Sequence, residues 1–164
     1  MERASTAESA RERVRELSHH IGGRAVPGRS VRFADVFDPS TGDVQARVPL
    51  ARADEVHDAV GVAAASQREW AGWNAQRRAR VLQRFLDLVA RDADALARLL
   101  SSEHGKTVAD ARGDIQRGVE VVEFSLGAPH LLKGEFSLDV GTGVDVASIR
   151  EPLGVAAGIT LFYF

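Results

Sequence analysis

The chain has 164 residues, a length that predicts a single domain. Hydrophobic residues make up 45%, charged residues 27%, and the formal net charge is −2. These values predict neither a nucleic-acid-binding surface nor attraction to an anionic membrane. The absence of cysteine excludes disulfides, thiolate metal ligands and a cysteine nucleophile within these residues. No stretch has the apolar length of a secretory signal or a membrane span, so a cytoplasmic protein is expected.

The first half of the chain begins with an extension and two hairpins. Residues 5–17 favour helix by composition but offer only Val14 and Leu17 as an apolar face, so a frayed, solvated extension is expected over residues 1–17. The pair Gly22-Gly23 between short extended segments is typical of a two-residue hairpin, because both central positions of such a turn need positive φ. A second hairpin is predicted over 33–48, with its turn at Asp38-Pro39-Ser40-Thr41-Gly42.

Helical periodicity begins at Asp54 and predicts four helices. The first is followed by Trp70 and Trp73, which are interpreted as core or interface residues. The second starts at Asn74 as an N-cap, turns its apolar stripe (Val81, Leu82, Phe85, Leu88 and Val89) inward and leaves its arginines (Arg77, Arg78, Arg80 and Arg84) in water. The third carries Leu96, Leu99 and Leu100 and stops at Gly105.

The fourth helix is predicted from Thr107, whose spacing to Asp110 is a variant of the capping box. Its apolar residues recur at spacings of three and four along one seam: Val108, Ala111, Ile115, Val119, Val122 and Leu126. Gly113 and Gly118 interrupt this helix, and close approach of another backbone would account for them. The helix is expected to end before Pro129.

The last part of the chain is extended. Residues 135–150 alternate apolar and polar side chains around Gly141-Thr142-Gly143, which predicts an arm or hairpin with one apolar face. Residues 151–164 begin with Pro152 and continue through the uncharged run Val155–Thr160, which is typical of an inner strand of a parallel sheet. Such a strand needs a neighbour on each side and a crossover connection.

The residues alone provide no complete catalytic site. Gly141-Thr142-Gly143 lacks the third glycine and the following helix of a dinucleotide fingerprint, so a turn is the better interpretation. The five histidines have no partner at metal-ligand spacing, and no metal site is predicted. The compact charged segment Glu103-His104-Gly105-Lys106 is interpreted as a helix cap with a surface ion pair.

Several segments together resemble the N-terminal third of the NAD-dependent aldehyde dehydrogenases. They are, in order and spacing, Ile21-Gly22-Gly23, Asp38–Gly42, Trp70 to Trp73, Leu99–Lys106, and Glu151–Val155 with Gly158–Thr160. Within that superfamily, residues 102–107, 113–118 and 127–134 are most similar to the CoA-acylating methylmalonate-semialdehyde dehydrogenases. The resemblance covers nearly the whole chain from about Ser18 onward.

The resemblance implies an α/β fold that is an incomplete aldehyde-dehydrogenase-like fold. Residues 18–134 would be the first part of the dinucleotide-binding domain, 135–150 an oligomerisation arm, and 151–164 the first strand of the parallel sheet, truncated. The implied reaction oxidises methylmalonate or malonate semialdehyde with NAD and passes the acyl group to coenzyme A. The arm would pair with another subunit of a homo-oligomer.

The resemblance also carries site residues onto the end of the chain. Thr160 and Phe162 match family positions that line the NAD site, whereas Leu161 replaces a proline. Tyr163 stands where the family has an asparagine that stabilises the oxyanion, and loss of such a donor costs ~10²–10³ in rate. No catalytic residue is therefore assigned. The family's cysteine nucleophile, general-base glutamate and pyrophosphate-binding turn lie later in its sequence.

Three interpretations follow. In the first, the chain is the N-terminal fragment of an aldehyde dehydrogenase, interrupted within the motif and inactive alone. In the second, it is a non-catalytic interaction protein whose arm, Glu135–Ile149, pairs with a full-length enzyme. In the third, it is an unrelated helical module whose turns coincide with those of the family.

Overall fold

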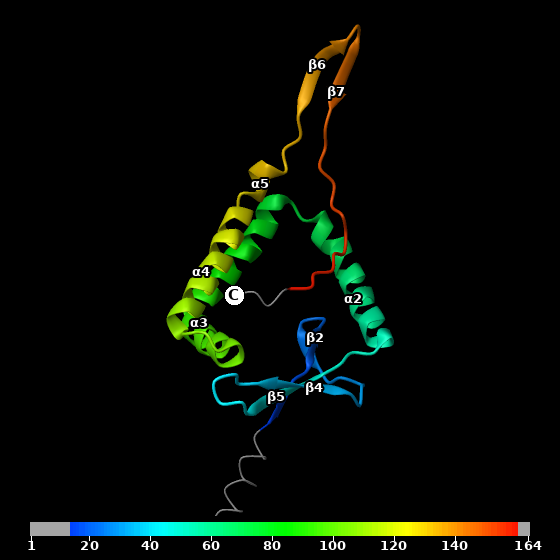
Figure 1. Ribbon diagram of the computed structural model, residues 1–164. Coiled ribbons are helices and arrows are strands. Elements are labelled where there is room, and N and C mark those ends of the chain that lie inside the picture. The colour runs from blue at the N-terminus through cyan, green and yellow to red at the C-terminus, as the bar shows by residue number, and fades with distance from the viewer. Residues whose placement is uncertain (1–13, 161–164) are drawn as a thin grey trace, which may run out of the picture. The chain divides into compact units, whose positions relative to one another are not determined.

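The computed structural model describes residues 14–160 (Figure 1). These residues form two compact units. The first unit holds the residues up to Ala63 together with Ala95–Ala111, and the second holds Ala64–Asp94 and the residues from Arg112 onward. Each unit contains parts of the long helices, and each is described by itself below.

The first unit contains a three-stranded sheet in the order β1-β5-β4. Strands β4 (Phe33–Phe37) and β5 (Val44–Pro49) form the predicted antiparallel hairpin, and Gly42 takes φ +79° in its turn. The hairpin predicted around Gly22-Gly23 pairs β2 (His19–Ile21) with β3 (Arg24–Val26), and both glycines have positive φ. Both hairpin predictions are confirmed.

The expectation of a frayed extension through Leu17 is wrong for its described end. Strand β1 (Arg15–Glu16) runs parallel to β5, and the Leu17 amide donates to the Arg47 carbonyl over 2.8 Å. The two residues of β1 are exposed and pair with β5 through their backbones, so no pattern of apolar side chains predicts this strand. Residues 1–13 lie outside the described part of the chain.

The helices are α2 (Ala53–Gly72), α3 (Ala75–His104), α4 (Val108–Ser125) and the short α5 (Ala128–Leu131). The second and third predicted helices are in fact one continuous helix, α3. The segment between their apolar stripes, Arg91–Ala95, contains neither glycine nor proline, and its alanines favour continuation. At the start of α3, Asn74 Oδ1 accepts from the Arg77 amide over 2.8 Å, as predicted for an N-cap.

The end of α3 and the start of α4 also follow the prediction. Gly105 has φ +85° and its amide donates to the Ser101 carbonyl, as expected of a glycine just past a helix. Thr107 Oγ1 accepts from the Asp110 amide over 3.2 Å and donates to the Asp110 carboxylate. In this capping box the Asp110 carboxylate therefore bonds to the hydroxyl of Thr107 and not to the backbone amide of Thr107.

The burial of the helices agrees with the predicted faces only in part. The seam of α4 is its less exposed side, and Ala111 is fully buried. On α3, Leu86 is buried, whereas Phe85 and Leu88 of the predicted inward stripe are about half exposed. Within the described residues, nothing stands within 4 Å of a Cβ placed at Gly113 or Gly118, so the structure shows no close backbone there.

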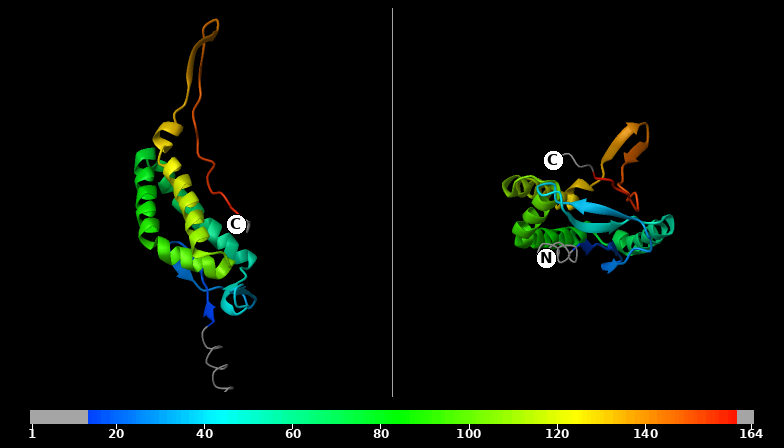
Figure 2. Two further views of the ribbon diagram at one scale, coloured as in Figure 1. Left: turned by 60° about the vertical axis from the view of Figure 1, so that its left-hand side comes forward. Right: turned by 60° about the horizontal axis from the view of Figure 1, so that its bottom comes forward.

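In the second unit, the arm forms the predicted hairpin from β6 (Phe136–Gly141) and β7 (Val144–Ala147), which extends beyond α5 (Figures 1 and 2). Its turn contains Gly143 at φ +69°. The pairing shifts register between Ser137 and Gly141, where Asp139 takes φ +48°. Every residue of both strands is exposed, and the sheet has only these two strands among the described residues.

The predicted strand over Val155–Thr160 is not observed in the described residues 151–160. These residues belong to no strand, and Ile159 is 94% exposed. An inner parallel strand takes its backbone hydrogen bonds from neighbours on both edges, and the described residues supply neither neighbour. The composition of a buried strand therefore occurs here without the sheet that would bury it.

Candidate functional site

Of the two residues predicted to line the NAD site, the structure describes only Thr160. Thr160 is exposed and lies outside any strand. Phe162 and Tyr163 lie outside the described residues.

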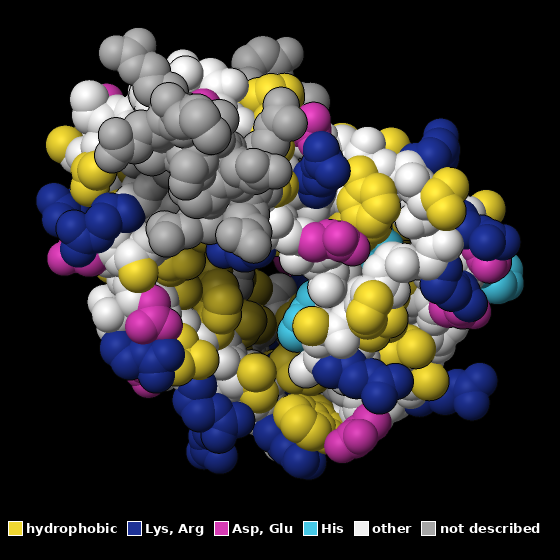
Figure 3. All heavy atoms as spheres, turned by 90° about the horizontal axis from the view of Figure 1, so that it is seen from below, with side chains coloured by type: hydrophobic (Ala, Val, Ile, Leu, Met, Phe, Trp, Pro, Cys, Tyr) yellow, Lys and Arg dark blue, Asp and Glu magenta, His cyan; other side chains and the backbone are white. Residues whose placement is uncertain are grey.

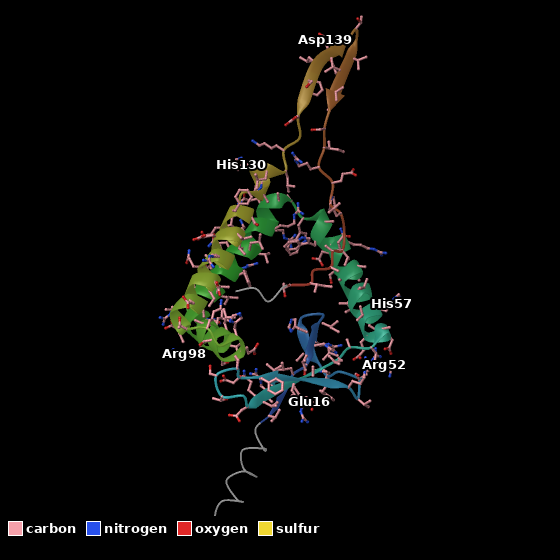
Figure 4. The ribbon with its side chains drawn as sticks, viewed as in Figure 1. Glu16, Arg52, His57, Arg98, His130 and Asp139 are labelled. Carbon is pink, nitrogen blue, oxygen red and sulfur yellow. The ribbon has the colours of Figure 1, made fainter. Side chains whose placement is uncertain are left out.

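The histidines are dispersed over the described elements. His57 lies on α2 and His130 on α5 (Figure 4). Between residues 14 and 160, no three side chains of His, Asp or Glu come together as a metal-binding group. No helix in that same range is long and apolar enough to cross a membrane.

The most highly organised polar cluster of the first unit surrounds Glu55, in the first turn of α2. Its carboxylate is 5% exposed and accepts from the Arg52 amide over 2.9 Å and from the Arg29 amide over 2.7 Å. Arg52 precedes α2, so Glu55 performs the backward half of a capping box (Figure 4). His19 Nε2 lies 3.7 Å from the same carboxylate.

The electrostatics of this cluster favour the charged forms. Hydrogen bonds from the backbone amides of Arg52 and Arg29 hold the pKa of Glu55 below its ordinary value. The bond from Arg29 Nη2 to Asp58 Oδ2, 2.7 Å long, raises the pKa of Arg29. Because both carboxylate oxygens of Glu55 are already occupied, the group ties the 27–32 loop to α2 and is unsuited to accepting a substrate proton.

A cleft of about 460 Å³ lies beside the cluster. Apolar residues of the β2–β3 hairpin and α2 form its floor, and Arg24, Arg29, Glu55 and Asp58 supply its charged groups. Since these charges come in both signs and Arg29 is tied to Asp58, the cleft shows no preference for one kind of ligand.

The second unit has a cleft of about 450 Å³ between α3 and α4. Its lining is mostly aliphatic and includes Leu86, Val89, Ile115 and Val119. Arg112 of α4 closes one end by bonding to Asp94 of α3 over 2.9 Å. Its polar lining residues include Asp87 and Glu123 but no histidine, serine or threonine, so the cleft is an apolar surface with carboxylates beside it.

The tryptophans lie at the junction of α2 and α3. Their ring centroids are 5.4 Å apart, and the Arg77 guanidinium lies 3.6 Å from the centroid of Trp73. Trp70 is 37% exposed, so the predicted core role is met only in part.

On the face drawn in Figure 3, acidic and basic side chains lie beside one another.

The Glu55 cluster was not predicted from the sequence, although one signal for it exists. A glutamate three residues after the residue that precedes a helix is typical of a capping box, and Arg52 and Glu55 have this spacing. The contribution of Arg29 comes from a residue 26 positions earlier in the chain, and no local pattern predicts it.

Comparison with known proteins shows which family this chain is similar to. The family model "Aldehyde dehydrogenase family" matches residues 26–164. A malonate-semialdehyde dehydrogenase of Pseudomonas aeruginosa is 43% identical over 148 residues, which cover 90% of this chain and 30% of that protein. A malonate-semialdehyde dehydrogenase 2 of Bacillus mycoides is 41% identical over 92% of this chain and 31% of its own length.

Solved structures agree. A Sinorhizobium meliloti protein assigned as a methylmalonate-semialdehyde dehydrogenase, crystallised with NAD, matches with a TM-score of 0.87 and 50% identity. The match covers 92% of this chain and 31% of that one. The methylmalonate-semialdehyde dehydrogenase of Oceanimonas doudoroffii matches with a TM-score of 0.80 and 39% identity. The chain thus spans about a third of these relatives, and the interpretation as an unrelated helical module is wrong.

Proposed function

Since the chain belongs to the aldehyde dehydrogenase family, we propose that it supplies the N-terminal part of an NAD-dependent, CoA-acylating dehydrogenase of methylmalonate or malonate semialdehyde. The observation that carries this proposal is the 38–50% identity to such dehydrogenases over about nine-tenths of this chain. A cytoplasmic location, where NAD and coenzyme A are available, belongs to the same proposal.

The contribution of this chain is structural. The Glu55 cluster fixes the N-terminus of α2 to the preceding loop, and Gln45 Nε2 of β5 donates to the Ser102 carbonyl near the end of α3. By the family resemblance, Thr160 and Phe162 are the residues of this chain that would line the site of NAD, which would supply the oxidising chemistry. The described residues do not fit NAD by themselves, because Thr160 is exposed and belongs to no strand.

These 164 residues alone are proposed to be inactive. Acyl transfer in this family begins with attack by a cysteine thiolate, and the chain contains no cysteine. The thiolate, the general base and most of the cofactor site must come from the two thirds of the relatives that this chain does not match. Substrate selection would also depend on that portion.

An assay of NADH production tests this proposal. The chain is mixed with NAD, coenzyme A and methylmalonate semialdehyde, with and without a separately produced polypeptide that corresponds to the unmatched two thirds of the Sinorhizobium meliloti relative. NADH is expected only in the mixture, at a rate ~10²–10³ below that of the intact relative, because Tyr163 replaces the asparagine that stabilises the oxyanion. A variant of the added polypeptide with its cysteine replaced by alanine is the control. If the two polypeptides co-elute and still produce no NADH, the assignment of activity is wrong.

A second function is favoured by the exposure of the arm. Phe136, Leu138 and Val140 are each more than half exposed, and a two-stranded hairpin is only marginally stable alone. The arm could therefore pair with a complete dehydrogenase subunit and alter its assembly without performing chemistry. Co-purification with such a subunit and loss of that subunit's activity on mixing would support this role. Unchanged activity and separate elution would exclude it.

A further inference from the structure

The two ends of the arm pair in registers that differ by two residues. Near the base of the arm, Ser137 of β6 lies opposite Val146 of β7. At the tip, Gly141 lies opposite Val144. Three residues of β6 separate these two pairs, whereas β7 has only Asp145 between them. Such an insertion is a β-bulge, which leaves the extra residues out of the ladder of paired strands.

Both ends of the arm are held in place by local contacts. At the base, the Ser148 amide donates to the Glu135 carbonyl over 2.8 Å, and the Ser148 hydroxyl accepts from the Glu135 amide over 2.9 Å. The Ser148 carbonyl also lies so close to Gly134 that a Cβ there would overlap it. At the tip, Gly143 takes φ +69°, which favours glycine. The difference of two residues must therefore be taken up between the ends.

The bulge is stabilised by one side chain. Asp139 takes φ +48° (Figure 4), and among the described residues it is the one residue other than glycine with positive φ. Its amide donates to Asp145 Oδ1 over 3.0 Å. Every residue of β6 and β7 is exposed, so a packed core does not hold Asp139 in this uncommon conformation. The hydrogen bond to Asp145 therefore stabilises the bulge.

We propose that Asp145 fixes the register of the arm, by holding β6 in the bulged pairing against a continuous pairing in which one end slides by two residues. A slide of this size moves a residue about 7 Å along its partner strand. Because side chains alternate with a period of two, the side chains of the sliding end stay on the same face of the arm. The alternation of apolar residues therefore does not select between the two pairings, and the Asp145 carboxylate does.

The bulge also interrupts the free edge of β6. The sheet has only β6 and β7 among the described residues, so the far edge of β6 is unpaired. Phe136, Leu138 and Val140 are each more than half exposed, and in a continuous strand this edge would be open to a strand from another chain. By fixing the bulge, Asp145 prevents such addition at β6. This role does not depend on dehydrogenase activity.

Nuclear magnetic resonance on the whole chain tests the proposal, because cross-strand contacts between backbone protons report the register. The native chain is expected to show two contacts together, Phe136 with Ala147 and Gly141 with Val144. In D145A one of the two should persist and the other should weaken about tenfold or more, since a hydrogen bond to a charged acceptor is lost. By light scattering, D145A should also aggregate faster than the native chain at equal concentration.

Two control variants separate this hydrogen bond from a general effect of charge. D145N keeps an oxygen that can accept from the Asp139 amide, so both contacts should remain. E135A removes another exposed carboxylate of the arm, whose side chain does not bond to Asp139, and should also keep both contacts. Equal aggregation of D145A and E135A would contradict the protection of the β6 edge.

Substitutions of Asp139 test the same bulge from the other strand. D139V should behave as D145A does, because a β-branched residue resists positive φ. In the double variant D139G/D145A, the lost contact should return, because glycine takes positive φ without steric cost. A D145A chain that keeps both contacts, or that loses both, would overturn the proposal, and so would a D139G/D145A chain that recovers nothing.

Discussion

Replacing Gly105 with alanine should lower the free energy of unfolding of the first unit by more than the cost of holding an alanine in the left-handed conformation. Gly105 has φ +85°, and an alanine there would place its Cβ 2.8 Å from Pro39 Cγ in the β4–β5 turn. The left-handed conformation costs an alanine about 1–2 kcal/mol. Displacing a rigid proline ring adds about 1 kcal/mol, the low end for overpacking, because Pro39 is exposed and can shift.

Gly42 is the matched control for this prediction. It has φ +79°, but nothing lies within 4 Å of a Cβ placed there, so Gly42→Ala should lose only the conformational part. Urea unfolding followed by circular dichroism measures both variants, and Gly105→Ala should be less stable than Gly42→Ala by about 1 kcal/mol, at an unchanged m-value. Equal losses would refute the reasoning, since they would show that α3 and the turn do not meet at Pro39.

Two further predictions concern the helix caps. Glu55→Ala should lower the urea midpoint at pH 7, and the difference from native should shrink on acidification, because a carboxylate with a lowered pKa stabilises above its unfolded pKa and loses that effect as pH falls through the folded pKa. A difference that is the same at pH 7 and pH 3 would contradict this. Thr107→Ala should cost about 1 kcal/mol and Thr107→Ser much less, because serine keeps the hydroxyl that accepts from Asp110; equal losses for both would show that the cap is not responsible.

Local signals predicted much of the fold. The positive φ at Gly22, Gly23 and Gly42 follows from turn chemistry, and the helix boundaries at Asn74, Gly105 and Thr107 follow from capping. The arm was predicted because alternation around Gly141-Thr142-Gly143 is a property of adjacent residues. These features need no knowledge of distant contacts.

The features that the sequence did not predict depend on contacts between distant parts of the chain, or on a distant pairing that the described residues do not form. Strand β1 pairs with β5 through backbone groups 31 positions away, and the Arg29 amide reaches Glu55 across 26 positions. Helix α3 was predicted as two helices because its apolar residues form two separate stripes, at 81–89 and at 96–100. The candidate NAD residues could be named only through the family resemblance. Thr160 is exposed, and none of the strands in residues 14–160 pairs with the segment before it.

Hydrogen exchange at residues 155–160 tests most directly whether this chain is completed by the rest of a dehydrogenase. We predict rapid exchange of these backbone amides in the chain alone, and protection once the polypeptide matching the remaining two thirds of the relative is added, because that polypeptide would supply the neighbouring strands. Strong protection of these amides in the chain alone, unchanged on mixing, would contradict the account.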